Sequence, residues 1–243
     1  MSQFSLFLGL GTFAGLLLVG WRAPQKELTR YLDAGLGILL GALGGGRALT
    51  VAAGWSYYQS HVGEILQVWL GGMSGVGALA GGMFALVIIS LLFKFPLGIL
   101  ADAFLPLAGT LTVAAWLGCW LIGVAYGAAS KAWWALPGRD EWGVIDKRLP
   151  VQLLGAIFSL VIIILLEGLG KRLPGRGMSY ALGIFGLSSI ILILSFFRAD
   201  PALALYGLRL ETWGAMILMI ISALIVVVLL LRRTGRLHKS LKG

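Results

Sequence analysis

The stretch that decides the fold is AGLGILLGALGGGRALTVAAGWSYYQSH, residues 34–61, an apolar run that carries a single charge, Arg47. An arginine inside a bilayer costs roughly 2.5–3.5 kcal/mol, and such residues usually face the interior of a helical bundle. The glycines before it, Gly44–Gly46, let another helix or a lipid head group approach closely. We therefore predict that Arg47 meets an anion, for which a phospholipid phosphate is the best candidate. In the alternative, Arg47 extends to the outer surface or bonds to helix-end carbonyls.

The composition of the whole chain agrees with a membrane protein. Of its 243 residues, 59% are apolar and 12% are charged, which excludes an ordinary soluble domain. The first apolar run is followed by more, so we interpret it as a retained span and not as a signal peptide. Cys119 is the single cysteine, and no Cys/His cluster has metal-ligand spacing, so we expect no disulfide, metal or other cofactor. The net charge of +9 lies mostly in short loops, which favours anionic lipid surfaces over nucleic acid as partners.

The hydropathy pattern predicts an all-α polytopic protein with seven transmembrane helices in one membrane domain, residues 1–243, because a span needs about 20 apolar residues. The predicted spans are Phe4–Gly20, Asp33–Ala53, Leu66–Phe93, Ala101–Tyr126, Pro150–Leu166, Met178–Phe197 and Thr212–Leu231. The third and fourth are long and rich in glycine. We expect a tilt, kink or break in each, at Gly71-Gly72 and at Pro106.

Basic residues predict the orientation of these spans. With the N-terminus outside, twelve lysines and arginines fall on the inner side and six on the outer side, which favours N-out, C-in. Two aromatic clusters, at residues 55–58 and 133–142, then lie at the outer interface, where such rings prefer to sit. The longest outer segment, residues 131–149, is expected to form a small extracytoplasmic cap.

The predicted spans contain few reactive groups. His61 falls in an outer loop and His238 in the basic tail, so no imidazole base is available at membrane depth. Cys119 lies mid-span without a basic neighbour and is expected to be inert. Asp102 begins a predicted helix, where a carboxylate acts as a helix-terminal charge more often than as a catalyst. No residue can therefore be named as catalytic.

Three polar residues are predicted to bind a lipid head group: Arg47, Gln152 and Arg198. Gln152 could instead bond another helix, and Arg198 could simply pair with Asp200 at the surface. If Arg198 turned inward, it and Arg47 could hold one phosphate, because guanidinium forks donate in pairs. The residues predicted to line a cavity between the third, fourth and fifth helices are Gly71, Gly72, Ser74, Trp116, Cys119 and Tyr126. Glycine runs such as residues 71–82 are also typical of close helix packing alone.

Six short motifs occur in a fixed order between Leu32 and Asp200. They are Gly45-Gly46-Arg47, Val68–Ser74, Asp102–Pro106, the frame from Leu117 to Gly127, Pro150–Leu153 and Phe196–Asp200. Together they resemble the motifs of the bacterial prolipoprotein diacylglyceryl transferases. The resemblance implies a seven-helix inner-membrane fold whose members move the diacylglyceryl group of phosphatidylglycerol to a lipobox cysteine and release glycerol phosphate. It implies a phosphatidylglycerol-like lipid and a lipoprotein precursor as partners.

Most polar positions of the family motifs hold apolar residues here. The replaced histidines correspond to Val76 and Leu149, and the replaced Arg, Asn and Glu residues to Trp116, Cys119, Ile122, Val124, Ile191 and Ser195. Two functions remain open. The chain is either a transferase that relies on Arg47, Gln152 and Arg198, or an inactive member, a pseudoenzyme that binds lipid or serves as a structural subunit of a membrane complex. A transporter is less favoured, because conducting pathways generally need polar groups at the midplane.

Overall fold

Seven helices in the described part of the chain are long and apolar enough to cross a membrane. The computed structural model describes residues 3–68, 71–140, 142–173 and 175–240. The seven helices are α1 Gln3–Arg22, α2 Leu28–Ala53, α4 Gly75–Leu92, α5 Leu97–Ile122, α6 Val151–Leu169, α7 Met178–Ser195 and α8 Leu210–Ser240. Short helices η1 (Gln25–Glu27), α3 (Trp55–Tyr58), η2 (Val62–Glu64) and η4 (Gly170–Arg172) lie between them. The prediction of an all-α polytopic membrane protein is confirmed.

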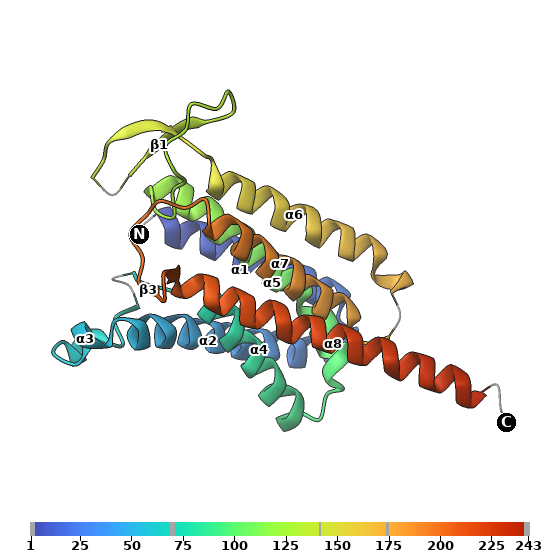
Figure 1. The fold of residues 1–243 in the computed structure, drawn as a ribbon. Helices are drawn as coiled ribbons and strands as arrows, with labels where there is room; N and C mark the ends of the chain where they lie inside the picture. Colours follow the sequence, from blue (N-terminus) through green and yellow to red (C-terminus); the bar gives the residue numbers. More distant parts are fainter. Residues whose placement is uncertain (1–2, 69–70, 141, 174, 241–243) are drawn as a thin grey trace.

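Two small antiparallel hairpins interrupt the helices. Strand β1 (Leu136–Arg139) pairs with β2 (Ile145–Arg148), so that Leu136 lies opposite Arg148, and β3 (Ala204–Leu205) pairs with β4 (Leu208–Arg209). The β1–β2 hairpin, α3 and β3 lie with the N-terminus at one end of the bundle, and the C-terminus lies at the other (Figure 1). We call the first of these the hairpin end. It carries the segment expected as an extracytoplasmic cap, and its outward orientation stays a prediction.

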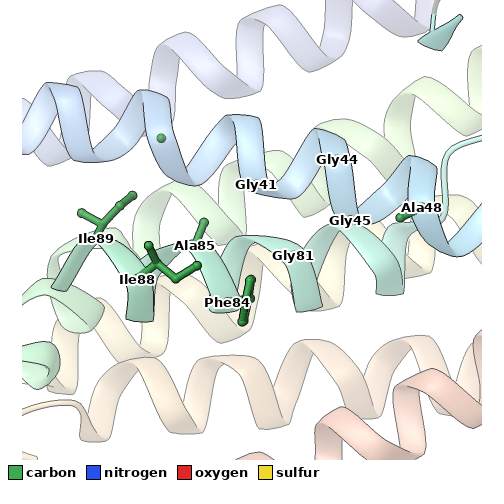
Figure 2. A pocket seen from close by; sticks show the side chains of 10 residues that line it. Gly41, Gly44, Gly45, Ala48, Gly81, Phe84, Ala85, Ile88 and Ile89 are labelled. Atoms are coloured by element: carbon green, nitrogen blue, oxygen red, sulfur yellow. The ribbon is translucent and has the colours of Figure 1, made fainter. Parts of the chain in front are cut away.

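Helices α2 and α4 pack with their backbones in contact. A Cβ atom on Gly45 would lie 2.5 Å from the carbonyl oxygen of Gly77, and one on Gly81 would lie 2.7 Å from the Cα of Gly45. No side chain fits at these positions, so the glycines of this pair serve close helix packing. An apolar groove of about 370 Å³ runs beside the contact, and Figure 2 shows Phe84 and Ala85 on its α4 wall.

Helix α1 packs in a similar way against α5, its partner in space although three long helices further along the chain. A Cβ on Gly15 would lie 2.8 Å from the Cα of Leu107. Helix α7 occupies the most enclosed position, with Ile184 and Leu187 fully buried. Its N-terminus is tied to α5 by Asp102, whose carboxylate accepts hydrogen bonds from the backbone N–H groups of Gly177 (2.6 Å) and Tyr180 (3.0 Å). Asp102 is thus a helix-terminal charge as predicted, but it caps α7 and not its own helix.

The third span differs from the prediction, which placed its start at Leu66. Helix α4 begins at Gly75, and the expected break at Gly71-Gly72 is present because both glycines adopt left-handed conformations, with φ of +89° and +70°. Ser74 caps the helix by accepting a hydrogen bond from the N–H of Gly77 at 3.2 Å. The predicted helical turns before the break are wrong for the described residues of that stretch, and Trp69 and Leu70 lie outside them.

The fourth and last spans also have different bounds. Helix α5 continues through Pro106 without a break and ends at Ile122, because Gly123 takes a left-handed conformation there (φ +70°). Tyr126 therefore lies in the following extended segment and not in the predicted helix. Helix α8 runs on to Ser240, well past the predicted end at Leu231.

Candidate functional site

Five of the positions at which the resemblance implies polar groups lie in one apolar cluster. Val76, Trp116 and Ile191 are buried members of this cluster, and Cys119 and Leu149 pack against it. We call these five residues the apolar cluster.

The apolar cluster is tightly filled. A Cβ on Gly155 would lie 2.5 Å from Cε2 of Trp116, and one on Gly214 would lie 2.5 Å from Cγ1 of Val76. Large side chains thus occupy the space that glycines on α6 and α8 leave open. A close-packed apolar environment strongly disfavours an unpaired polar or charged group.

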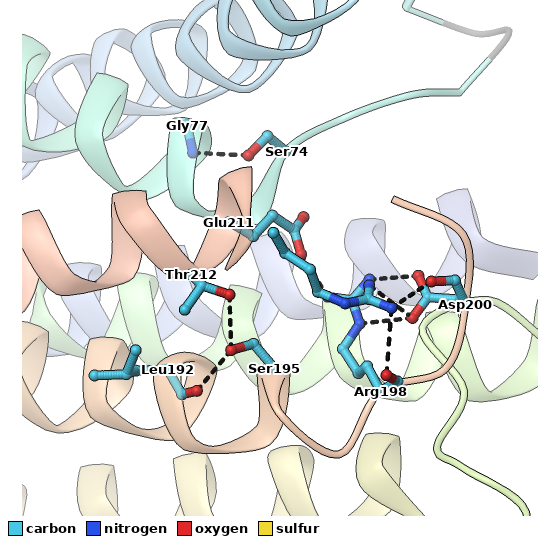
Figure 3. Close-up of polar contacts among 9 residues, drawn as sticks. Ser74, Gly77, Leu192, Ser195, Arg198, Asp200, Glu211 and Thr212 are labelled. Carbon is cyan, nitrogen blue, oxygen red and sulfur yellow. Dashed lines mark hydrogen bonds and ion pairs between the residues drawn. The ribbon is translucent and has the colours of Figure 1, made fainter. Parts of the chain in front are cut away.

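Ser195, another of the replaced positions, has its hydrogen bonds satisfied locally. Its hydroxyl donates to the carbonyl oxygen of Leu192 at 2.7 Å and accepts from Oγ1 of Thr212 at 2.9 Å (Figure 3). The last two replaced positions, Ile122 and Val124, are exposed near the end of α5. The hydroxyl of Ser195 therefore joins α7 to α8 and plays a structural part.

Arg47 is buried and binds backbone carbonyls. Its Nε donates to the carbonyl oxygen of Ile65 (2.9 Å), its Nη2 to that of Glu64 (2.6 Å), and its Nη1 to those of Gly71 (2.8 Å) and Gly72 (3.2 Å). Its guanidinium carbon also lies 5.2 Å from the centre of the Tyr58 ring. These bonds match the carbonyl alternative for Arg47 and hold the segment between α3 and α4. Contact of Arg47 with a phosphate stays a prediction.

Arg198 belongs to a network of ion pairs at the hairpin end. Its guanidinium pairs with Asp200 at 2.7 Å and with Glu211, and Arg209 also pairs with Asp200 at 3.1 Å (Figure 3). Burial alone would lower the pKa of Arg198, but hydrogen bonds to Asp200 and the charge of Glu211 outweigh it and raise that pKa above its usual range. The pair with Asp200 is therefore present. The described contacts do not join Arg198 to Arg47.

Gln152 and Tyr126 line one cavity, at the hairpin end. The cavity has a volume of about 290 Å³ and lies between the end of α5, the start of α6 and the β1–β2 hairpin. Gln152 is buried there and donates from Nε2 to the carbonyl oxygen of Val124 at 3.0 Å. Tyr126 is buried beside the guanidinium of Arg148, whose central carbon is 4.7 Å from the Tyr126 ring centre.

The predicted site residues are thus divided among several places. Gly71 and Gly72 lie in the segment that Arg47 holds, Ser74 caps α4, and Trp116 and Cys119 belong to the apolar cluster. Of the nine predicted residues, Gln152 and Tyr126 line the hairpin cavity. The binding of a lipid by any of the nine stays a prediction.

Sequence reasoning missed the charged residues of the hairpin. Arg148 and Arg139 line the cavity, and Arg148 pairs with Asp140 at 2.9 Å. Asp140 also accepts from the backbone N–H of Val144 at 2.9 Å, in the turn that contains Gly143. The available signal was an Asp followed by Gly between two short segments with β-forming residues, which favours a hairpin turn. Among the described residues, no group of three or more His, Cys, Asp or Glu side chains could hold a metal ion.

Comparisons with known proteins agree on one family. The family model described as prolipoprotein diacylglyceryl transferase matches residues 1–228. A phosphatidylglycerol–prolipoprotein diacylglyceryl transferase of Thermosynechococcus vestitus is 25% identical over 233 residues, which cover 87% of this chain and 86% of the relative. Proteins of the same name from Streptomyces griseus (28% over 227 residues; 89% and 68%) and Chlamydia muridarum (29% over 222 residues; 80% and 76%) are also similar. Because the family model matches nearly the whole sequence, this chain belongs to the prolipoprotein diacylglyceryl transferase family.

Proposed function

We propose that this member of the family does not transfer diacylglyceryl groups and acts in the bacterial inner membrane as a lipid-binding or structural subunit of a membrane complex. The observation that supports the proposal is the apolar cluster. Five positions at which the resemblance implies polar groups are brought together there, and their side chains pack against one another. A replaced active site that was merely damaged would leave polar partners unsatisfied, whereas this one is consistently apolar.

The chemistry of the transfer makes such a cluster a poor place for it. The sulfur of a lipobox cysteine must attack the glycerol carbon of phosphatidylglycerol, while the bond from that carbon to the phosphate oxygen breaks and glycerol phosphate leaves. The thiol proton needs an acceptor, and the charge that develops on the phosphate needs fixed cations or donors. The apolar cluster supplies neither. The guanidinium groups of Arg47 and Arg198 are committed to carbonyls and carboxylates.

An active transferase is the second candidate, because family membership favours it. The relatives' names give phosphatidylglycerol and a prolipoprotein as their substrates, and these would be the partners of this chain in that case. Gln152 and the hairpin arginines would then have to position the lipid, and electrostatic stabilisation alone would have to lower the barrier.

The deciding experiment is a transfer assay with purified protein in vesicles that contain phosphatidylglycerol, together with a lipobox peptide. Mass spectrometry would follow the peptide thioether and the released glycerol phosphate. The Thermosynechococcus vestitus relative, prepared in the same way, is the positive control. We expect no product above that of vesicles without protein. Product formation by this chain that depends on the peptide cysteine would refute the proposal, and stoichiometric phospholipid in native mass spectra would support the lipid-binding form.

A further inference from the structure

The cavity under the β1–β2 hairpin combines cationic and apolar walls. Arg139 and Arg148 are its charged lining residues, and no carboxylate lines it among the described residues. Its other walls are largely apolar. They include Trp120 and Leu121 from the end of α5, and Leu121 is partly exposed. A site of this kind suits a ligand with an anionic part and an apolar part.

Arg148 is fixed in place but is not fully used. Its Nη2 donates to Oδ2 of Asp140 at 2.9 Å, and its guanidinium stacks over Tyr126. Its Nε is buried and has no hydrogen-bond partner among the described residues. A buried guanidinium N–H without a partner is costly, because it loses water without gaining a replacement. Such a donor on a cavity wall is best explained by an acceptor that a ligand brings.

Asp140 positions Arg148 more than it neutralises the cavity. One of its oxygens accepts from the backbone N–H groups of Trp142 (3.0 Å) and Val144 (2.9 Å), and the other accepts from Arg148. Its charge is thus spread over the hairpin turn. Arg139 makes no ion pair among the described residues and is exposed, so it can meet an arriving anion.

The start of α6 adds a further positive contribution. Gln152, in the first turn of this 19-residue helix, lines the cavity, and the helix has Pro150 at its N-cap, without a side-chain cap bond. The first N–H groups of a helix and its dipole favour an anion at this end.

We propose that this cavity binds the phosphate oxyanion of an amphiphile, with Arg148 and Arg139 as its cationic partners. Ligand pockets for drug-sized molecules are about 300–1,000 Å³. The volume here, about 290 Å³, is therefore enough for a phosphorylated head group but too small for two acyl chains. The chains would remain in the bilayer beside the apolar wall. This inference rests on the lipid-binding form of the proposed function and adds its site and its chemistry.

The test is calorimetric titration of the full-length protein in detergent with three probes. These are short-chain phosphatidylglycerol, the matching short-chain diacylglycerol without phosphate, and inorganic phosphate. The variants are Arg148→Gln and Arg139→Gln. The matched control is Lys147→Gln, which removes an equal charge from the same strand but not from the cavity lining. Thermal melting of each variant checks the fold, and Arg139→Gln keeps the test decisive if Arg148→Gln disturbs the turn.

We expect phosphatidylglycerol to bind and diacylglycerol not to bind. Each cavity variant should raise the Kd about tenfold or more, the loss typical of one charge-assisted hydrogen bond. Lys147→Gln should change it less than about twofold, as for a screened surface charge. Equal effects of Lys147→Gln and Arg148→Gln, or equal binding of diacylglycerol, would overturn the proposal. Inorganic phosphate that binds as tightly as the lipid would assign the site to free phosphate and also overturn it.

The outcome can be separated from that of the transfer assay. If product forms and the Kd depends on Arg148, the cavity is a binding site and the non-catalytic function is wrong. If no product forms and the Kd is independent of Arg148, the non-catalytic function stands and the cavity proposal is wrong.

Discussion

Replacing Arg47 with leucine would remove four hydrogen bonds that hold the segment between α3 and α4. In the structure, the guanidinium donates to carbonyl oxygens of Glu64, Ile65, Gly71 and Gly72. Leucine is apolar and offers no donor, so these carbonyls must turn to water or remain unpaired. The segment should therefore open more often, while the helices on either side stay packed.

The size of the effect follows from the exposure of the four carbonyls. A net contribution of about 1 kcal/mol per hydrogen bond gives an upper value of about 4 kcal/mol. Gly71 and Gly72 are exposed, so water can replace the donor there, whereas Glu64 and Ile65 are half-buried. We expect a loss of about 2–4 kcal/mol in local stability. That corresponds to about thirtyfold to several hundredfold faster amide exchange where opening controls the rate.

Hydrogen exchange followed by mass spectrometry, in detergent, measures this directly for peptides that cover residues 62–68. Peptides from α7 serve as the internal reference. Arg47→Lys should give an intermediate rate, because an ammonium keeps the charge but loses the planar fork. Unchanged exchange in Arg47→Leu would show that the carbonyl bonds do not hold the segment. A loss of bound phospholipid in this variant, without faster exchange, would instead favour the predicted contact with a phosphate.

The remaining predictions concern packing and polar contacts elsewhere in the bundle. Gly81→Ala should destabilise the protein by about 1–3 kcal/mol because no Cβ fits against α2. Gly44→Ala, where nothing lies within 4 Å of the added Cβ, should leave the Tm unchanged or higher; similar melting of the two variants would contradict the packing argument. Asp102→Ala should cost about 0.5–2 kcal/mol by removing the cap of α7, seen as faster exchange in its first turn. Asp200→Asn should cost up to about 3–5 kcal/mol by leaving the largely buried Arg198 with a weaker partner, and a Tm equal to that of the unaltered protein would refute this.

The sequence predicted the seven spans because hydropathy over about 20 residues is a strong signal. Bounds were less well predicted. Helix α4 begins nine residues after the predicted Leu66, because two glycines in left-handed conformations and the cap by Ser74 decide its start. Hydropathy does not detect such backbone features. Helix α8 extends past the predicted Leu231 because a helix can continue in water after the apolar stretch ends.

The candidate site was less predictable than the spans. Arg47 stood out because it is a lone charge in an apolar run, but its partners are backbone carbonyls, which leave no trace in the residue pattern. Gln152 was chosen correctly as a residue near the start of a helix, whereas the cavity that it lines depends on a hairpin that folds over it. Arg148 was read only as a basic residue of an outer loop. Its burial arises from the pairing of β1 with β2.

The pairing of α1 with α5 has a consequence for how the protein is made. The face of α1 that contains Gly11 and Gly15 packs on a helix that ends at Ile122, one hundred residues after the end of α1 at Arg22. At translation rates of about 5–20 residues per second, α1 waits in the lipid for about 5–20 seconds before its partner leaves the ribosome. Insertion and assembly of this protein are therefore separate events, and the newborn first helix is the element most in need of a chaperone or a lipid to shield its bare backbone.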